Sequence, residues 1–166
     1  MKKQKGFTLV ELLVVIAIVA ILAGAVLIAI NPAAMMQKAR DSRRLGDLDT
    51  LVKAVNLAIT EGEITFTDMV AAATSAQADA QVVDGTGWVR FPAPVAPKVG
   101  LSRYVAALPL DPTNVAPNVY SFQSTLTDFE INAVLEHADN IIKMTTDGGN
   151  DPARYEAGTS LIIMDP

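Results

Sequence analysis

Apolar residues dominate the N-terminal part of the chain. Between Phe7 and Ile30 every residue is apolar or small except Thr8 and Glu11. A helix of that length rises about 36 Å, which is enough to cross a membrane hydrocarbon core of about 30 Å. The pattern therefore predicts a membrane-spanning helix over residues 7–30, with Glu11 as a single carboxylate near its first end.

A different pattern follows, in which apolar residues recur at helical spacings: Leu45, Leu48, Val52, Val55 and Ile59. This periodicity predicts an amphipathic helix that packs one face against another element. Asn31-Pro32 lies between the two patterns, and a proline kinks a helix because it removes a backbone hydrogen bond. We therefore expect one long helix over residues 7–60, kinked near Pro32 and followed by a stop at Gly62.

The C-terminal part carries strand signals. Residues 120–123 and 129–136 alternate apolar and polar side chains, which is typical of antiparallel strands with one covered face. The side chains expected to face the helix are Phe122, Phe129, Ile131, Ala133 and Leu135. We also expect short strands at 88–91 and 160–164, and a short helix at 67–73. The prediction is an α+β fold in which the long N-terminal helix packs on a small antiparallel β-sheet.

Composition narrows the chemistry that the chain can perform. The 166 residues hold no cysteine and one histidine, His137, and the net charge is −5. A disulfide is therefore excluded, a zinc site or a histidine-dependent triad has almost no ligands, and a general nucleic-acid-binding surface is not expected. The part of the chain after residue 60 also has no nucleophile elbow and no phosphate-binding glycine loop, so we expect no enzyme.

Basic residues mark two places in the chain. Lys2, Lys3 and Lys5 precede the apolar run without an acidic residue among them, so the positive-inside tendency places the N-terminus in the cytoplasm. No Ala-x-Ala cleavage site follows the run, which predicts that the span is retained in the mature protein. Residues 38–44 form a second, mainly basic cluster. It is either a solvated helix face with local ion pairs or a contact for acidic patches on neighbouring subunits or for lipid phosphates.

One stretch near the C-terminus has the composition of a cation-binding loop. Asp147, Asn150 and Asp151 lie close together on a glycine-bent segment. Hard cations such as Ca²⁺ bind roughly six to eight oxygen atoms, and these side chains would supply several of them. The spacing is not that of an EF-hand, however, and the same residues are typical of a plain turn. A Ca²⁺ site and a plain turn both remain open.

The segment from Lys5 to Ile16 reads KGFTLVELLVVI and resembles the class III signal of type IV pilins and type II secretion pseudopilins. In that family a prepilin peptidase cuts after the glycine that matches Gly6 and methylates the new N-terminal amine, which here belongs to Phe7. The glutamate that matches Glu11 pairs with the N-terminal amine of a neighbouring subunit during assembly. The resemblance therefore implies processing at Gly6 and Phe7 and an assembly contact at Glu11.

The resemblance also implies an organisation of the chain and a place in the cell. Residues 1–6 would be the cleaved leader, 7–30 the transmembrane and filament-core helix, 31–60 its amphipathic continuation and 61–166 a globular, pilin-like head. The chain would lie in the inner membrane, with its N-terminus in the cytoplasm, until the pilus assembly machinery adds it to an extracellular filament of identical subunits. Such a structural subunit requires no cofactor.

Two machines use subunits of this kind, the type IV pilus and the pseudopilus of type II secretion. The long stretch over residues 63–100 and a head larger than a minimal pseudopilin favour the pilus. The proline-flanked turn at Asp111 resembles one in major pseudopilins, and together with a calcium loop it would favour the pseudopilus. We expect a type IV pilus subunit, with a type II secretion pseudopilin as the alternative.

Overall fold

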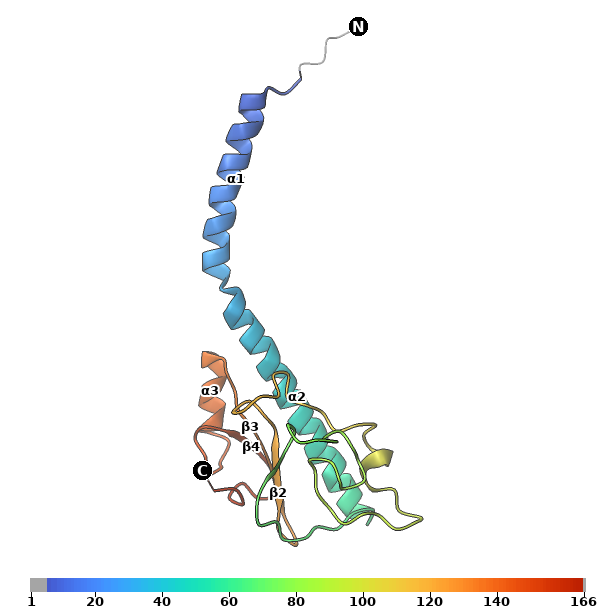
Figure 1. Ribbon diagram of the computed structural model, residues 1–166. Helices are drawn as coiled ribbons and strands as arrows, with labels where there is room; N and C mark the ends of the chain where they lie inside the picture. Colours follow the sequence, from blue (N-terminus) through green and yellow to red (C-terminus); the bar gives the residue numbers. More distant parts are fainter. Residues whose placement is uncertain (1–5, 166) are drawn as a thin grey trace. The chain divides into compact units, whose positions relative to one another are not determined.

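The computed structural model describes residues 6–165, apart from the side chains of Ile28 and Ala29. Lys2, Lys3 and Lys5, on which the topology prediction rests, lie outside the described residues. The chain divides into two compact units, Met1–Met36 and Gln37–Pro166. From here on, the head is the second unit, which begins earlier than the head of residues 61–166 expected from the sequence. Figure 1 shows the order of the elements along the chain.

The first helix, α1 (Leu9–Ile30), is apolar on all sides, and every side chain described in it is exposed. Its most hydrophobic window, Leu9–Leu27, spans 19 residues with a mean hydropathy of 2.9, and none of it is buried. A helix that is hydrophobic all round is stable where an apolar medium or other helices surround it. By length and composition, α1 therefore meets the requirements of a membrane-spanning helix.

The predicted kink coincides with an interruption of the helix. Asn31 adopts the left-handed conformation with φ 45°, which asparagine tolerates better than most residues, and it ends α1. Pro32 is then the first residue of α2 (Pro32–Thr60). At that position a proline is favourable, because the first helical N–H has no partner within the helix anyway. The break is therefore where we predicted it, but Pro32 starts a new helix and does not bend a continuous one.

The head contains a four-stranded antiparallel sheet in the order β1-β2-β3-β4, so each strand pairs with its neighbours in chain order. The strands are β1 (Ala73–Thr74), β2 (Ser121–Ser124), β3 (Phe129–Ala133) and β4 (Tyr155–Gly158). Two short helices complete the head, the 3₁₀ helix η1 (Gly100–Arg103) and α3 (Ala138–Met144). Together with the long N-terminal helices, this sheet gives the predicted α+β, pilin-like fold.

The core of the head lies between α2 and the inner face of the sheet. The five side chains predicted to face the helix are all buried: Phe122, Phe129, Ile131, Ala133 and Leu135. On α2 the buried apolar side chains are Leu48, Leu51, Ala54, Val55 and Ala58. Three residues of the predicted stripe, Leu45, Val52 and Ile59, are only half-buried. The helix is therefore turned slightly from the expected phase and presents Leu51 to the sheet.

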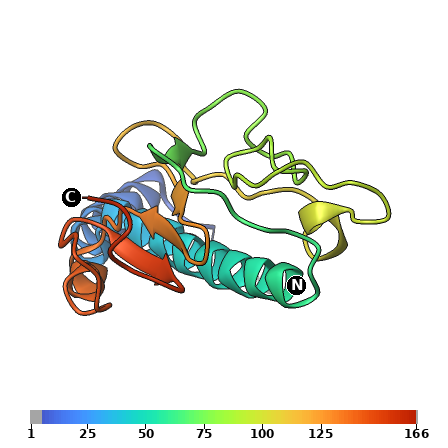
Figure 2. The same cartoon turned by 90° about the horizontal axis from the view of Figure 1, so that it is seen from below.

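The long connection between β1 and β2 completes the core. Figure 2 shows it beside the C-terminal part of α2, beyond the sheet. Trp88 is fully buried there, its Nε1–H donates to the carbonyl of Pro109 over 2.9 Å, and its ring centroid lies 5.7 Å from that of Tyr120. The connection therefore contributes buried side chains to the core, although residues 92–99 within it are mostly exposed.

Several short elements differ from the prediction. Residues 88–91 form no strand, because the N–H of Trp88 donates to Ala80 within the connection. The predicted helix at 67–73 is also wrong, since the N–H of Met69 donates to Ser124 and the segment runs beside β2. The terminal strand expected at 160–164 does not form, and β4 lies earlier in the chain.

Candidate functional site

The N-terminal end of α1 carries the residues predicted to be processed. Gly6 and Phe7 precede the helix, and the Phe7 side chain is 85% exposed. Thr8 is the N-cap residue in extended conformation. The Gly6–Phe7 peptide bond therefore lies just outside the first helical turn.

Thr8 and Glu11 form a capping box, in which each side chain satisfies a backbone N–H of the other residue. The backbone N–H and the Oγ1–H of Thr8 each donate to Oε2 of Glu11 over 2.8 Å. The N–H of Glu11 donates to Oγ1 of Thr8 over 3.2 Å. The carboxylate of Glu11 is thus fixed in the first turn, close to Phe7 in the sequence, at the end of the helix that favours negative charge.

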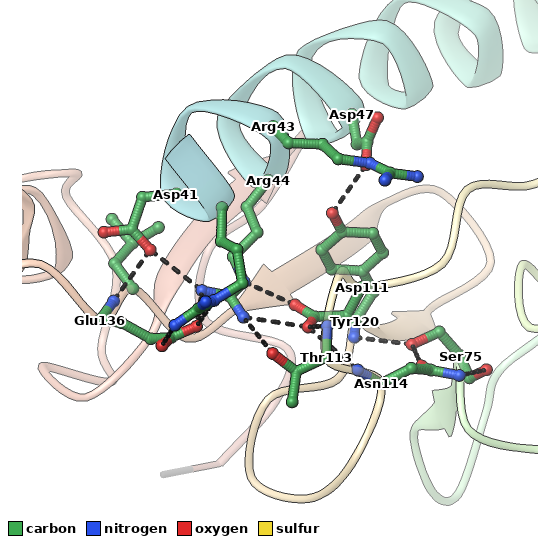
Figure 3. Close-up of polar contacts among 12 residues, drawn as sticks. Asp41, Arg43, Arg44, Asp47, Ser75, Asp111, Thr113, Asn114, Tyr120 and Glu136 are labelled. Carbon is green, nitrogen blue, oxygen red and sulfur yellow. Dashed lines mark hydrogen bonds and ion pairs between the residues drawn. The ribbon is translucent and has the colours of Figure 1, made fainter. Parts of the chain in front are cut away.

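A second polar centre lies in the head, around the fully buried guanidinium of Arg44 (Figure 3). Arg44 and Asp41 come from one turn of α2, Asp111 comes from the proline-flanked turn, and Glu136 follows β3. We call these four residues the Arg44 cluster. Arg44 binds Asp111 with two hydrogen bonds, Nε–Oδ2 of 2.6 Å and Nη2–Oδ1 of 3.0 Å, and its Nη1 lies 3.0 Å from Oδ1 of Asp41.

The remaining oxygens of the Arg44 cluster are also satisfied. Asp41 accepts the backbone N–H groups of Glu136 and His137 over 2.9 and 2.8 Å, and Nδ2 of Asn140 over 3.1 Å. Glu136 pairs with Arg44 and accepts from Nε of Arg40 over 2.9 Å. This hydrogen bond from Arg40, with Arg44 beside it, lowers the pKa of Glu136 to about 2. The cluster joins α2 to two distant segments of the head.

The basic residues at 38–44 therefore make ion pairs within the head, most of them with residues distant in sequence. Besides Arg40 and Arg44, the exposed Lys38 pairs with Asp139 over 3.0 Å, and Arg43 lies 3.6 Å from Asp47. The sequence did not indicate these acidic partners, because Asp111, Glu136 and Asp139 lie about 65 to 100 positions away in the chain. A pairing of this range is set by the fold and leaves no local signal.

The C-terminal loop holds the three residues predicted to bind calcium. Asp147 accepts the N–H groups of Gly149 and Glu156, over 3.1 and 2.9 Å. Asp151 accepts the N–H of Ala153 over 2.8 Å and faces Nε of Arg154 over 3.4 Å. Backbone donors thus already engage both carboxylates.

The third residue, Asn150, differs from these two aspartates. Its Oδ1 is buried and has no hydrogen-bond partner. Within residues 6–165, no group of three or more His, Cys, Asp and Glu side chains is arranged to hold a metal ion. Calcium binding by the predicted trio stays a prediction.

The sequence did not indicate two further carboxylates as part of a site. Glu130 on β3 and Glu156 on β4 are 0% and 2% exposed, and they lie on the sheet face opposite the core. Burial, together with the contact to Glu130, raises the pKa of Glu156 to about 7. Both residues occupy polar positions of alternating strands, which normally face solvent. Nothing in that pattern signals that another segment covers them.

The comparison with known families bears on the N-terminus. Residues 1–27 match the family model described as the prokaryotic N-terminal methylation motif. The match includes Gly6, Phe7 and Glu11, the residues at which processing and assembly were predicted. No curated protein and no solved structure matches the chain. The N-terminal segment of this protein is therefore the class III signal that type IV pilins and pseudopilins share.

Proposed function

We propose that this protein is a structural subunit of a type IV pilus-like filament. A prepilin peptidase cuts it after Gly6 and methylates the amine of Phe7, and identical subunits then polymerise through α1. The observation that carries this proposal is the N-terminal methylation motif at residues 1–27, which includes most of α1. This helix is exposed and apolar apart from one carboxylate, Glu11. Motifs of this kind belong to structural subunits and not to enzymes.

The composition of α1 suits both environments that the proposal requires, first the membrane and then the filament. Its apolar surface is compatible with a lipid bilayer before assembly and with a bundle of other subunits afterwards. In either medium an unpaired carboxylate is costly, by at least about 2.5 kcal/mol at the centre of a membrane. The amine that cleavage creates at Phe7 of a neighbouring subunit would neutralise Glu11, and the capping box holds that carboxylate at the helix end where such an amine would arrive.

This proposal includes an orientation. With the N-terminus in the cytoplasm, α1 would anchor the subunit in the inner membrane and the head would lie on the outer side. Extraction from the membrane by the assembly machinery would then expose the head on the surface of the filament. The partners are the prepilin peptidase, the assembly machinery and further copies of this chain.

A substitution at Glu11 tests the assembly contact. In Glu11→Ala we expect normal insertion and cleavage, because neither needs the carboxylate. Filament yield should fall at least about tenfold, because losing one ion pair in an apolar bundle costs more than about 1.4 kcal/mol of assembly free energy. The measurement is the amount of subunit in sheared filaments relative to membranes. Glu61→Ala, at an exposed carboxylate that follows α2 in the chain, is the matched control. Normal filament yield in Glu11→Ala contradicts the proposed pairing.

The pseudopilin of a type II secretion system is the alternative, favoured by the proline-flanked turn. Asp111 in this turn is 3% exposed and bound by Arg44, so the turn is a fixed part of the head. Deletion of the gene separates the two functions. A pilus subunit predicts loss of surface filaments that contain this chain, identified by peptide mass spectrometry. A pseudopilin predicts loss of secreted proteins while surface filaments are unchanged.

A further inference from the structure

The outer face of the sheet carries three buried polar side chains. Glu130 and Asn132 alternate with core residues along β3, and the register places Asn132 directly opposite Glu156 on β4. Directly opposed side chains of antiparallel strands have Cβ atoms about 4.5–5.5 Å apart. Yet the three residues are only 0%, 1% and 2% exposed, because the two parts of the chain that flank β4, residues 147–154 and 159–165, cover them. We call these two parts together the C-terminal segment.

Backbone groups of this covering segment hold one oxygen of each carboxylate. Oε2 of Glu130 accepts the N–H groups of Ile163 and Met164 over 2.6 and 3.0 Å. Oε2 of Glu156 accepts the N–H of Asp151 over 3.1 Å. The segment also approaches closely at Gly149, where an added Cβ would lie only 1.8 Å from Oε2 of Glu156.

Glu130 and Glu156 occupy diagonal positions on the paired strands β3 and β4, a separation that long side chains can bridge. Neither forms an ion pair with any residue between 6 and 165. The nearby Arg154 is directed to Asp151 and Ser121. The two carboxyl groups are thus almost fully buried, and no basic side chain of the described residues forms a salt bridge with either of them. Buried charges of this kind are normally paired or bound to a metal ion.

Four buried oxygens in this part of the head have no hydrogen-bond partner: Oε1 of Glu130, Oδ1 of Asn132, Oδ1 of Asn150 and Oε1 of Glu156. Asn150 belongs to the same place, because its neighbours Gly149 and Asp151 both contact the Glu156 carboxylate. All four atoms are acceptors, and buried acceptors normally find a partner. The site therefore lacks positive charge and donors but has a surplus of oxygen ligands.

A proton and a metal ion would each supply the missing charge, and the number of free oxygens separates them. A proton shared between the carboxyl groups satisfies two oxygens and leaves both amide oxygens unpaired. A hard divalent cation binds carboxylate and amide oxygens alike, takes roughly six to eight of them, and balances both charges. We propose that Glu130 and Glu156, with the amide oxygens of Asn132 and Asn150, bind one Ca²⁺ ion between the sheet and the C-terminal segment.

This site differs from the calcium loop predicted from the sequence. Of the three predicted ligands only Asn150 takes part, since backbone donors engage the carboxylates of Asp147 and Asp151. The bound ion would fasten the C-terminal segment to the sheet in a chain that has no cysteine for a disulfide. The proposal does not depend on the filament function.

Thermal unfolding of the full chain in detergent tests the site, with EDTA and with millimolar Ca²⁺. We expect Ca²⁺ to raise the Tm by at least about 5 °C, because it binds only the folded head. Mg²⁺ should have a smaller effect, since it retains its own water ligands. Glu130→Gln and Glu156→Gln should each lose most of the shift. Glu61→Gln removes the same charge from an exposed site in the turn that follows α2 and should keep the full shift.

Several outcomes overturn the proposal. One is that Ca²⁺ leaves the Tm of the wild type unchanged, and another is that both glutamine variants keep the Ca²⁺-induced rise in Tm. A third is that only Asp147→Asn or Asp151→Asn removes this rise, which would assign the ion to the loop. A Tm that falls with rising pH and does not change with Ca²⁺ would indicate a proton shared between the two carboxyl groups. If the glutamine variants do not fold, native mass spectrometry of the wild type decides. After EDTA treatment and return of Ca²⁺, one bound ion per chain supports the site and none overturns it.

Discussion

At the scale of single residues, Arg44 poses the main energetic problem of the head. It is a fully buried cation, and removing water from a guanidinium is unfavourable unless anions bind it in good geometry. Asp111 binds it with two hydrogen bonds, and Asp41 and Glu136 complete its surroundings. Charge-assisted, bidentate pairs are the strongest of their kind. The Arg44 cluster therefore fixes how α2 sits against the proline-flanked turn and the end of β3.

Glu136 makes the cluster sensitive to acid. Its pKa is about 2 in the folded head and 4.5 in a free side chain, so it stabilises the fold fully above about pH 4.5. That stability is lost as the pH falls from about 4.5 towards about 2. We expect Glu136→Gln to be about 1.5–3 kcal/mol less stable at neutral pH and to show a flatter decline in this acid range. Urea unfolding of the full chain in detergent, followed by circular dichroism, measures both effects.

The matched control for this prediction is Glu61→Gln, which alters an exposed carboxylate outside the Arg44 cluster. It should follow the wild-type dependence on pH. Parallel curves for the wild type and Glu136→Gln would show that Glu136 carries no such stability.

At the scale of elements, the sequence predicts those whose residues repeat with a clear period. An unbroken apolar run and a helical period predicted the helical segments before and after residue 31, although as one kinked helix, and Gly62 predicted the stop. Alternation of apolar and polar residues predicted the inward side chains of β2 and β3. The phase of α2 was slightly wrong, because Leu51 belongs to its buried face and the chosen stripe did not include it. Periodicity fails where an element is short, as in α3, or where burial comes from a segment distant in sequence.

The candidate sites also differ in whether a local sequence signal or only the fold identifies them. Gly6, Phe7 and Glu11 belong to one local motif, so the sequence alone was enough to single them out. The Arg44 cluster and the pair Glu130–Glu156 join residues from different elements, and only the fold brings them together. A glutamate at a polar position of a strand looks solvent-exposed until the segment that covers it is placed.

The long connection between β1 and β2 gives a prediction at the same scale. Trp88 joins this connection to the core, since it is fully buried and hydrogen-bonded to Pro109. We expect Trp88→Ala to destabilise the head by about 3–5 kcal/mol, the usual cost of deleting a buried aromatic side chain. Chemical unfolding followed by circular dichroism measures this. Val70→Ala, at a fully exposed position, should change stability by less than about 0.5 kcal/mol. Similar small effects of both substitutions would mean that the connection lies outside the cooperative core.

At the scale of the whole molecule, the two units have different requirements. The head has its own apolar core and an exposed polar surface, as a protein in water does. Helix α1 has no polar face along its apolar window and needs lipid or other subunits around it. The methylation motif at the start of this helix agrees with a chain that moves from a membrane to a filament.

Mass spectrometry of the mature N-terminus tests most directly whether the N-terminal signal is processed. The protein is purified from the membranes and surface fraction of cells that make it with their own peptidase. We predict a chain that begins at Phe7 with a methyl group on its amine and lacks residues 1–6. A Gly6→Val variant should retain the leader and serve as the unprocessed reference. A wild-type protein that still begins with Met1 in both fractions would show that the chain is not cut after Gly6.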